Sequence, residues 1–172
     1  MPEIILIAAI AQTNGVIGDR GKLPWSIPED LKRFRQLTLH HTVIMGRKTW
    51  EFDLQKRPLP QRRNIIISSQ KCQADGVEFV RSLSQAFDSA DPKLFVIGGA
   101  SIYRQALDFV DRMELTIVEG DYSGDVFFLE WRDRLSEFEL IQIEQRDKYR
   151  FETYVRSEKT LAWRWAIDGL YS

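Results

Sequence analysis

The feature of this sequence that most limits its possible folds is a series of short, almost continuous apolar runs. These runs are rich in β-branched residues and cover Ile4–Ile10, Thr42–Met45, Asn64–Ile67 and Leu94–Ile97. A strand exposed on one face alternates apolar and polar residues, so runs without alternation are typical of strands buried on both faces. We therefore predict a mostly parallel sheet with helices on either side.

Helical patterns lie between these runs. Ser26 and Glu29 have the spacing of a capping box, and apolar residues then recur at helical spacing as far as Leu37, which predicts a helix over residues 27–38. The first two-thirds of the chain thus alternates strands and helices, which is typical of an α/β fold. We predict two further helices, at residues 84–89 and 101–109.

The last third of the chain changes character. Strand candidates follow one another at Met113–Val118, Phe138–Glu144 and Arg150–Val155, and Asp147-Lys148 between the last two favours an antiparallel hairpin. The expected fold class is therefore α/β, with a single-domain, mixed and mostly parallel central sheet flanked by helices. The antiparallel hairpin would lie at the C-terminal side of that sheet.

Length and composition narrow the class of protein. The 172 residues allow one sizeable core, and we divide them into a domain at residues 1–157 and an apolar C-terminal extension of unknown role at residues 158–172. With 24 basic and 25 acidic residues, the net charge of −1 argues against nucleic acid or an anionic membrane as a partner.

The first apolar run follows Glu3 and is too short for a signal peptide or membrane span. The single cysteine, Cys72, cannot form an internal disulfide, which fits a cytoplasmic protein, and the adjacent histidines at 40–41 favour no metal site.

Small, hydroxyl and basic residues follow three of the predicted strands. They are Gly46-Arg47-Lys48-Thr49, Ser68-Ser69 and Gly98-Gly99-Ala100-Ser101. In an open α/β sheet, ligands bind beyond the carboxyl ends of the strands, where free backbone N–H groups can hold a phosphate. Glycine would allow close approach, and the two basic side chains would suit an adenosine 2'-phosphate. Each segment alone is explained better by a tight strand-to-helix turn with solvated basic side chains, because none has the G-x-G-x-x-G spacing. Together they favour a dinucleotide site.

Asp30 is unusual within the first predicted helix, because it lies beside Ile27, Leu31 and Phe34 rather than on a polar face. An acidic residue in the first turn also interacts favourably with the helix dipole, and that effect accounts for many such aspartates. In a pocket, the carboxylate would pair with two N–H groups of a flat, amidine-like heterocycle. Phe34 would then supply an apolar wall.

In their order and spacing, these motifs resemble the bacterial dihydrofolate reductase family over about residues 4–156. The resemblance implies an NADPH-dependent enzyme that reduces 7,8-dihydrofolate to 5,6,7,8-tetrahydrofolate for one-carbon metabolism. It further implies hydride transfer to pterin C6, with water-mediated protonation of N5 assisted by Asp30. The segments that carry the resemblance are Ile7–Ala11, Asn14–Gly18, Leu23–Leu31, Val43–Trp50, Arg57–Pro60, Arg62–Asn64 and Val96–Tyr103.

The resemblance also implies roles for residues on the substrate side. Asp30 corresponds to the carboxylate that binds the pterin 2-amino group and N3, with Trp25 holding a water near it and Thr116 supporting it by a hydrogen bond. These three form the expected catalytic set. Arg62 corresponds to the arginine that holds the α-carboxylate of the glutamyl tail, and Leu59 packs on the aminobenzoyl group. The expected pocket walls are Ala9, Ile10, Leu31, Phe34, Ile97 and Tyr103.

On the cofactor side, the resemblance places Ile17 near the nicotinamide and Thr49 near the phosphates. Residues 15–23 resemble the mobile loop that closes over the nicotinamide, and residues 120–125 resemble the loop that braces it. The expected NADPH contacts are Ala11, Ile17, Gly18, Gly46, Arg47, Lys48, Thr49, Ser68, Ser69, Gly98, Gly99, Ala100, Ser101 and Ile102.

The chain departs from the family pattern in three places. Ser101 stands where many members have an arginine near the 2'-phosphate, which leaves Arg47 and Lys48 to carry more of the preference for NADPH. The stretch from residue 50 to residue 58 is longer than in close relatives, and residues 158–172 extend past the usual end of the family. We expect dihydrofolate and antifolate inhibitors as small-molecule partners, and a monomer whose apolar extension offers a route to self-association.

Two other functions are compatible with parts of this pattern. Reductases that act on ribosylated pyrimidines in riboflavin synthesis share the fold, but they do not need Asp30 in a Pro-Trp-x-x-Pro-x-Asp setting. A catalytically silent nucleotide-binding or assembly module would use the Trp-rich extension as its working surface, and it would not need intact pocket residues. Loss of NADPH absorbance on adding dihydrofolate separates both from a dihydrofolate reductase.

Overall fold

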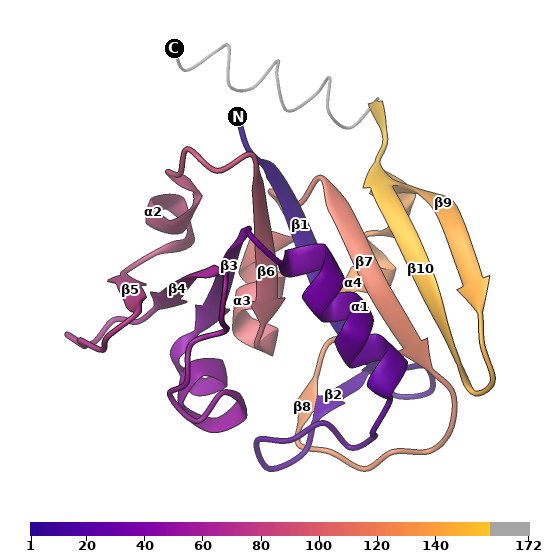
Figure 1. Ribbon diagram of the computed structural model, residues 1–172. Helices are drawn as coiled ribbons and strands as arrows, with labels where there is room; N and C mark the ends of the chain where they lie inside the picture. Colours follow the sequence, from indigo (N-terminus) through magenta and orange to yellow (C-terminus); the bar gives the residue numbers. More distant parts are fainter. Residues whose placement is uncertain (159–172) are drawn as a thin grey trace.

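The computed structural model describes residues 1–158, and the rest of the predicted extension lies outside the described residues. Eight strands form one sheet, and they come from the start, the middle and the end of the described chain (Figure 1). Their bounds are β1 Glu3–Ala11, β3 Thr42–Gly46, β4 Arg63–Ile67, β5 Val77–Val80, β6 Lys93–Gly98, β7 Arg112–Val118, β9 Phe138–Gln145 and β10 Tyr149–Arg156.

The strand order is β5-β4-β3-β6-β1-β7-β10-β9. The pairs β1 with β6, β1 with β7, β3 with β4, β3 with β6 and β4 with β5 are parallel. β10 is antiparallel to both β7 and β9. The predicted mixed sheet and C-terminal hairpin are therefore confirmed. β1 lies at the centre of the order, and both strands that flank it come much later in the chain.

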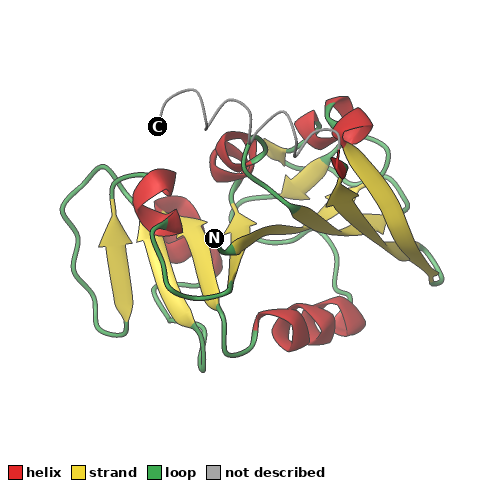
Figure 2. Ribbon diagram, turned by 90° about the horizontal axis from the view of Figure 1, so that it is seen from above, coloured by secondary structure: helices red, strands yellow, loops and turns green. Residues whose placement is uncertain are grey.

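Helices cover both faces of the sheet. α1 lies against one face, where it is seen below the sheet in Figure 2. Its residues Phe34 and Leu37 pack in an apolar cluster with Ile5 and Ile7 of β1. The neighbouring β1 residues Leu6, Ala8 and Ile10 belong to a second cluster, which includes residues of the other helices. The helix bounds are α1 Pro28–Thr38, α2 Leu83–Phe87, α3 Ala100–Ala106 and α4 Glu130–Asp133, with a π-helical turn η1 at Thr49–Asp53 and a 3₁₀ turn η2 at Leu135–Glu137.

The start of α1 differs from the prediction in one respect. The N-cap residue is Ile27, and no side chain caps the helix, so the predicted capping box of Ser26 and Glu29 is wrong. Glu29 instead accepts hydrogen bonds from Arg146 and from the hydroxyl of Tyr149. Pro28 has no N–H to satisfy and is pre-shaped for the first helical position, so the helix can begin without the box.

Several short elements are absent from the sequence prediction. β2 Val16–Gly18 pairs with β8 Val126–Phe127 in a small second sheet. η1 overlaps the stretch that we expect to be longer than in close relatives, and π-helical turns often occur at functional sites. Among the described helices, none has the length and apolar character to cross a membrane.

Candidate active site

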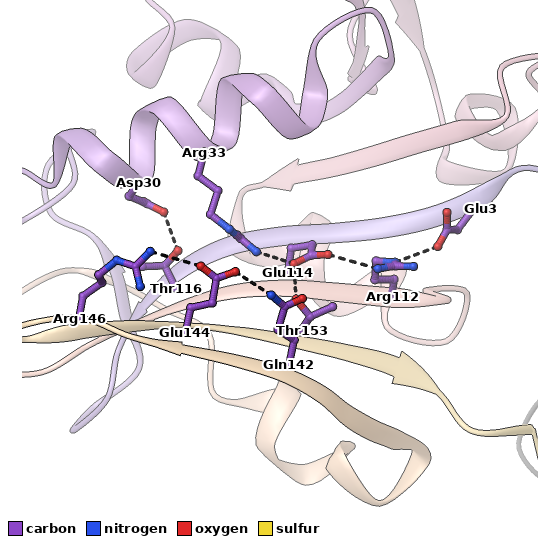
Figure 3. A network of polar contacts seen from close by, with 10 residues as sticks. All are labelled: Glu3, Asp30, Arg33, Arg112, Glu114, Thr116, Gln142, Glu144, Arg146 and Thr153. Carbon is purple, nitrogen blue, oxygen red and sulfur yellow. Dashed lines mark hydrogen bonds and ion pairs between the residues drawn. The ribbon is translucent and has the colours of Figure 1, made fainter.

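Asp30 and Thr116 meet where α1 crosses β7. The hydroxyl of Thr116 donates to Oδ1 of Asp30 over 2.5 Å, as Figure 3 shows. Burial raises the pKa of Asp30, while the Thr116 hydrogen bond and the nearby Arg33 guanidinium oppose that rise. The site therefore holds a poorly hydrated carboxyl group with one oxygen anchored and the other available to a ligand.

An apolar wall separates Asp30 from a cation near the other end of α1. Phe34, Leu59 and Ile97 pack on the same cluster under α1. The guanidinium of Arg62 lies 6.0 Å from the centre of the Phe34 ring. Its Nη1 donates to Thr38 over 3.1 Å, and its Nε donates to a backbone carbonyl. Together these groups suit a ligand with a hydrogen-bonding head, an apolar middle and an anionic end.

The other four residues expected to line the pocket differ in their exposure and in the face of the sheet on which they lie. Leu31 is 58% exposed, and Ala9 is half-buried next to Thr116 in the register of β1 and β7. Ile10 and Tyr103 are buried in the cluster on the opposite face from Phe34. The Tyr103 hydroxyl lies 2.8 Å from a backbone carbonyl of β1 and from one of β6, so it ties these two strands together.

The indole nitrogen of Trp25 shares one property with that of Trp131. Nε1 of both residues is buried without a hydrogen-bond partner among the described residues, and the Trp25 ring stands edge-on to Tyr122 at 5.0 Å. Buried indole N–H groups usually find a partner. The vacant donor therefore suits a water molecule or a ligand atom.

Glycines bring the strand ends and α3 together at the expected nucleotide site. A Cβ on Gly46 would lie 3.0 Å from Cγ1 of Ile102, so β3 and α3 pack at a distance that a larger residue would disturb. Gly98 has φ +124°, a conformation that side chains disfavour, and a cis peptide bond joins it to Gly99. A Cβ on Gly99 would lie 3.5 Å from the hydroxyl of Thr49. The expected phosphate-binding segments are thus neighbours in space.

The cations at this end are less fixed than Arg62. Arg47 forms an ion pair with Glu51 at 2.9 Å, and Lys48 is exposed. Beside the carboxyl ends of β4 and β5 lies a cavity of about 510 Å³. Its lining residues are Ser68, Gln70, Lys71, Cys72, Gln73, Phe79, Val80 and Arg81.

Arg81 is a candidate cofactor residue that sequence reasoning missed. It directly follows β5, and the backbone N–H of Ser68 donates to the carbonyl of Val80 over 2.9 Å. The signal in the sequence was weak because β5 has only four residues, and it is flanked by Gly76 and Arg81. Recognition of β5 would have placed Arg81 at the same sheet edge as Ser68 and Ser69.

The loop of residues 15–23 and its flanking residues contact two other segments. Asn14 Nδ2 donates to the carbonyl of Tyr122 over 2.8 Å, and the backbone of Asp125 donates to that of Gly18 over 3.1 Å. On the other side, a Cβ on Gly21 would lie 3.2 Å from Cβ of Phe52 in η1. Residues 15–23 therefore lie between the segment that follows β7 and the π-helical turn.

Sequence reasoning also missed Asp53, which follows Phe52 at the end of η1. Burial raises the pKa of Asp53 to about 6, against a hydrogen bond from Thr49. Asp53 is thus a second buried acid with a raised pKa, and it lies close to a residue expected beside the phosphates. No group of three or more metal-ligating side chains occurs within residues 1–158.

Comparisons with known proteins agree with this geometry. The family model described as "Dihydrofolate reductase" matches residues 3–158. The dihydrofolate reductase of Buchnera aphidicola subsp. Acyrthosiphon pisum (strain APS) is 44% identical over 132 residues, which are 76% of this chain and 81% of that protein. That of Mycobacterium tuberculosis (strain ATCC 25618 / H37Rv) is 40% identical over 154 residues, or 84% and 93% of the two chains. A solved structure of dihydrofolate reductase from Enterococcus faecalis, complexed with NADP(H) and RAB-propyl, matches with a TM-score of 0.80 and 31% identity, over 91% of this chain and 97% of that one.

Proposed function

The chain belongs to the dihydrofolate reductase family, and we propose that it reduces 7,8-dihydrofolate to 5,6,7,8-tetrahydrofolate with NADPH, using Asp30 to orient and polarise the pterin. The observation that carries this proposal is the order of three groups beside α1: Asp30 in its first turn, Phe34 in its middle, and Arg62, from the segment before β4, at its C-terminal end. Dihydrofolate has a head with amidine-like N–H groups, an aminobenzoyl middle and a glutamate tail. Its three parts therefore match the three parts of the pocket in order.

We assign the substrate contacts accordingly. The pterin 2-amino group and N3 would donate to Asp30, as flat N–H pairs do to carboxylates. Phe34 and Leu59 would hold the aminobenzoyl ring, and Arg62 would bind the α-carboxylate of the tail. Antifolate inhibitors with an amidine-like edge would bind the same carboxylate.

The reaction adds a hydride to C6 and a proton to N5 of the pterin. NADPH, when bound, supplies the hydride. The anionic Asp30 favours positive charge on the pterin, and so favours a proton at N5. The unpaired Nε1 of Trp25 would hold an ordered water near the pterin, while residues 15–23 exclude bulk solvent.

The residues at the strand ends fit a dinucleotide. The close packing at Gly46 holds β3 against α3, and the bare backbone at Gly98 and Gly99 would let a pyrophosphate approach the start of α3. Arg47, Lys48 and Ser69 would bind the 2'-phosphate, although Arg47 must be shared with Glu51. Arg81 adds charge at the same sheet edge and compensates in part for the serine at position 101.

The direct test follows absorbance at 340 nm, the NADPH band, when dihydrofolate is added. We expect a decrease that depends on both compounds, and tetrahydrofolate as the product. A decrease with a ribosylated aminopyrimidine instead would favour the riboflavin-type reductase. No decrease with either substrate, in protein that still binds NADPH, would favour a silent binding module.

A further inference from the structure

Two polar contacts join α1 to β7 in succession, one helical turn apart. The first is the hydrogen bond between Asp30 and Thr116. The second is an ion pair in which Nη2 of Arg33 lies 2.6 Å from Oε2 of Glu114. Asp30 and Arg33 are three residues apart on the helix, while Thr116 and Glu114 are two apart on the strand, so each pair shares a face (Figure 3).

Both charges of the second contact are held in place. The Glu114 side chain is 7% exposed and that of Arg33 is 18% exposed. The hydroxyl of Thr153 donates to Glu114 over 2.8 Å, and Arg112 lies 3.5 Å from its other oxygen. The Arg33 guanidinium also stacks over the ring of Phe151 at 4.6 Å. Charges held away from water act over longer distances than surface charges.

We infer that Arg33 and Glu114 are a positioning pair, which sets the pH range of turnover through their opposite electrostatic effects on Asp30 and the pterin bound to it. This inference rests on the proposed function. Neither residue needs to touch the substrate. Arg33 is the cation about one turn along the helix from Asp30 that lowers the pKa of Asp30, and Glu114 both neutralises Arg33 and fixes its direction.

Other charged groups near Asp30 come from three elements. On α1, Glu29 is its neighbour and raises the pKa of Asp30, whereas Arg33 lowers it; burial raises it most. On the hairpin, Arg146 pairs with Glu29 and Glu144. On β7, Arg112 pairs with both Glu114 and Glu3 of β1. Arg33 is the one basic residue among these that directly lowers the pKa of Asp30 within the described chain.

The two members of the pair should therefore shift the pH dependence in opposite directions. Arg33→Met keeps the packing on Phe151 but removes the positive charge, so the pKa of Asp30 and that of N5 in the bound pterin both rise. Turnover, which needs a proton at N5, then persists to higher pH. Glu114→Gln leaves Arg33 uncompensated, so both pKa values fall and turnover declines at lower pH. A purely structural pair would impair turnover in both variants without these opposed shifts.

The test uses two measurements on the full-length protein. The first is an NMR pH titration of the Asp30 carboxyl carbon in the ligand-free state. The second is the pH profile of kcat and KM with dihydrofolate. Arg33→Lys retains the charge and should keep the parental titration. The exposed ion pair of Arg63 and Glu78 offers matched controls, and R63M and E78Q should not shift Asp30.

The outcomes separate this inference from the proposed function. Opposed shifts in the titration support the pair even in protein that does not reduce dihydrofolate. Turnover of dihydrofolate without a shift in either variant overturns the pair and leaves the function intact. If Glu114→Gln does not fold, the difference between Arg33→Met and Arg33→Lys decides, since those two variants differ mainly in charge.

Discussion

The two ends of the proposed site are built in different ways. At the pterin end, Asp30 is buried, and one of its oxygens is anchored by a single hydroxyl. At the nucleotide end, the positive charges lie on exposed or half-exposed side chains, and Arg47 is already engaged by Glu51. Water screens exposed charges and weakens each of them, whereas a buried charge keeps its effect. Function should therefore depend on one residue at the first end and on many at the second.

The substitution Asp30→Asn should have the largest effect, and it tests whether function at the pterin end depends on this one residue. It keeps the shape of the side chain but removes the charge that favours a proton at N5. Because general acid–base assistance typically contributes 10²–10⁴-fold, we expect turnover at neutral pH to fall by a factor on that order. NADPH binding should change little. The measurement is kcat over a range of pH, with an NADPH titration of parent and variant.

A low pH should restore part of the variant's rate, since solvent can then protonate N5. Asp53→Asn is the matched control, because burial raises the pKa of Asp53 as it raises that of Asp30, and its removal should leave the Asp30-dependent profile intact. Parental turnover of Asp30→Asn at neutral pH would show that Asp30 only stabilises the helix start.

The same variant should not lose stability at neutral pH. Burial raises the pKa of Asp30 in the folded state, so its contribution to folding is fully present below the unfolded pKa and is lost as pH rises through the folded pKa. Asparagine has no such loss. Thermal unfolding between pH 4 and pH 8 should therefore show a Tm difference that moves in favour of the variant as pH rises. A Tm difference that is constant over this range would contradict the raised pKa.

Arg62→Gln should have the next largest effect. A hydrogen bond between charged groups contributes about 1.5–3 kcal/mol, which corresponds to roughly 10- to 150-fold in affinity. Because the tail carboxylate is far from the reacting atoms, we expect KM for dihydrofolate to rise with kcat little changed. The decisive comparison uses a pterin substrate without the glutamate tail, for which parent and variant should have the same KM.

Arg47→Ala should have a smaller effect, because several residues share the binding of the cofactor at the nucleotide end. The loss of one phosphate contact should lower the NADPH-over-NADH preference, and competition from Glu51 limits that loss to about tenfold. Lys48→Ala should matter less. Values of kcat/KM with both cofactors decide the point, and an unchanged ratio in the Arg47 variant would remove this residue from the 2'-phosphate site.

Deletion of residues 158–172 should have the smallest effect on catalysis. All the proposed site residues precede this segment, so turnover of dihydrofolate should stay nearly unchanged. The segment is rich in apolar residues, and its loss should alter solubility, stability or association state instead. Light scattering and thermal unfolding, measured beside kcat, test both halves of this prediction.

The length and regularity of each element determined whether it could be predicted from sequence. The buried strands were found because their apolar runs are continuous, and α1 because its apolar residues recur at helical spacing. β5 and the small β2–β8 sheet were missed because two to four residues do not establish a period. The resemblance to a known family supplied the expected roles of Asp30 and Arg62, which local pattern alone would have left ambiguous.

The pair formed by Arg33 and Glu114 was out of reach for a different reason. Arg33 looks like an ordinary solvated residue of an amphipathic helix, and Glu114 like a polar position in a strand. Only the packing of α1 across β7 turns them towards each other. A local signal did exist in β7, where Arg112, Glu114 and Thr116 alternate with apolar residues and so mark one polar face.

The central position of β1 has a consequence for synthesis of the chain. β1 leaves the ribosome before the other strands of its sheet, and its partners β6 and β7 begin about 80 and 100 residues after its end. At a translation rate of about 5–20 residues per second, its apolar run waits at least about 4–16 s for a partner. During that time the nascent chain exposes an unpaired hydrophobic strand, which is the kind of segment that promotes aggregation.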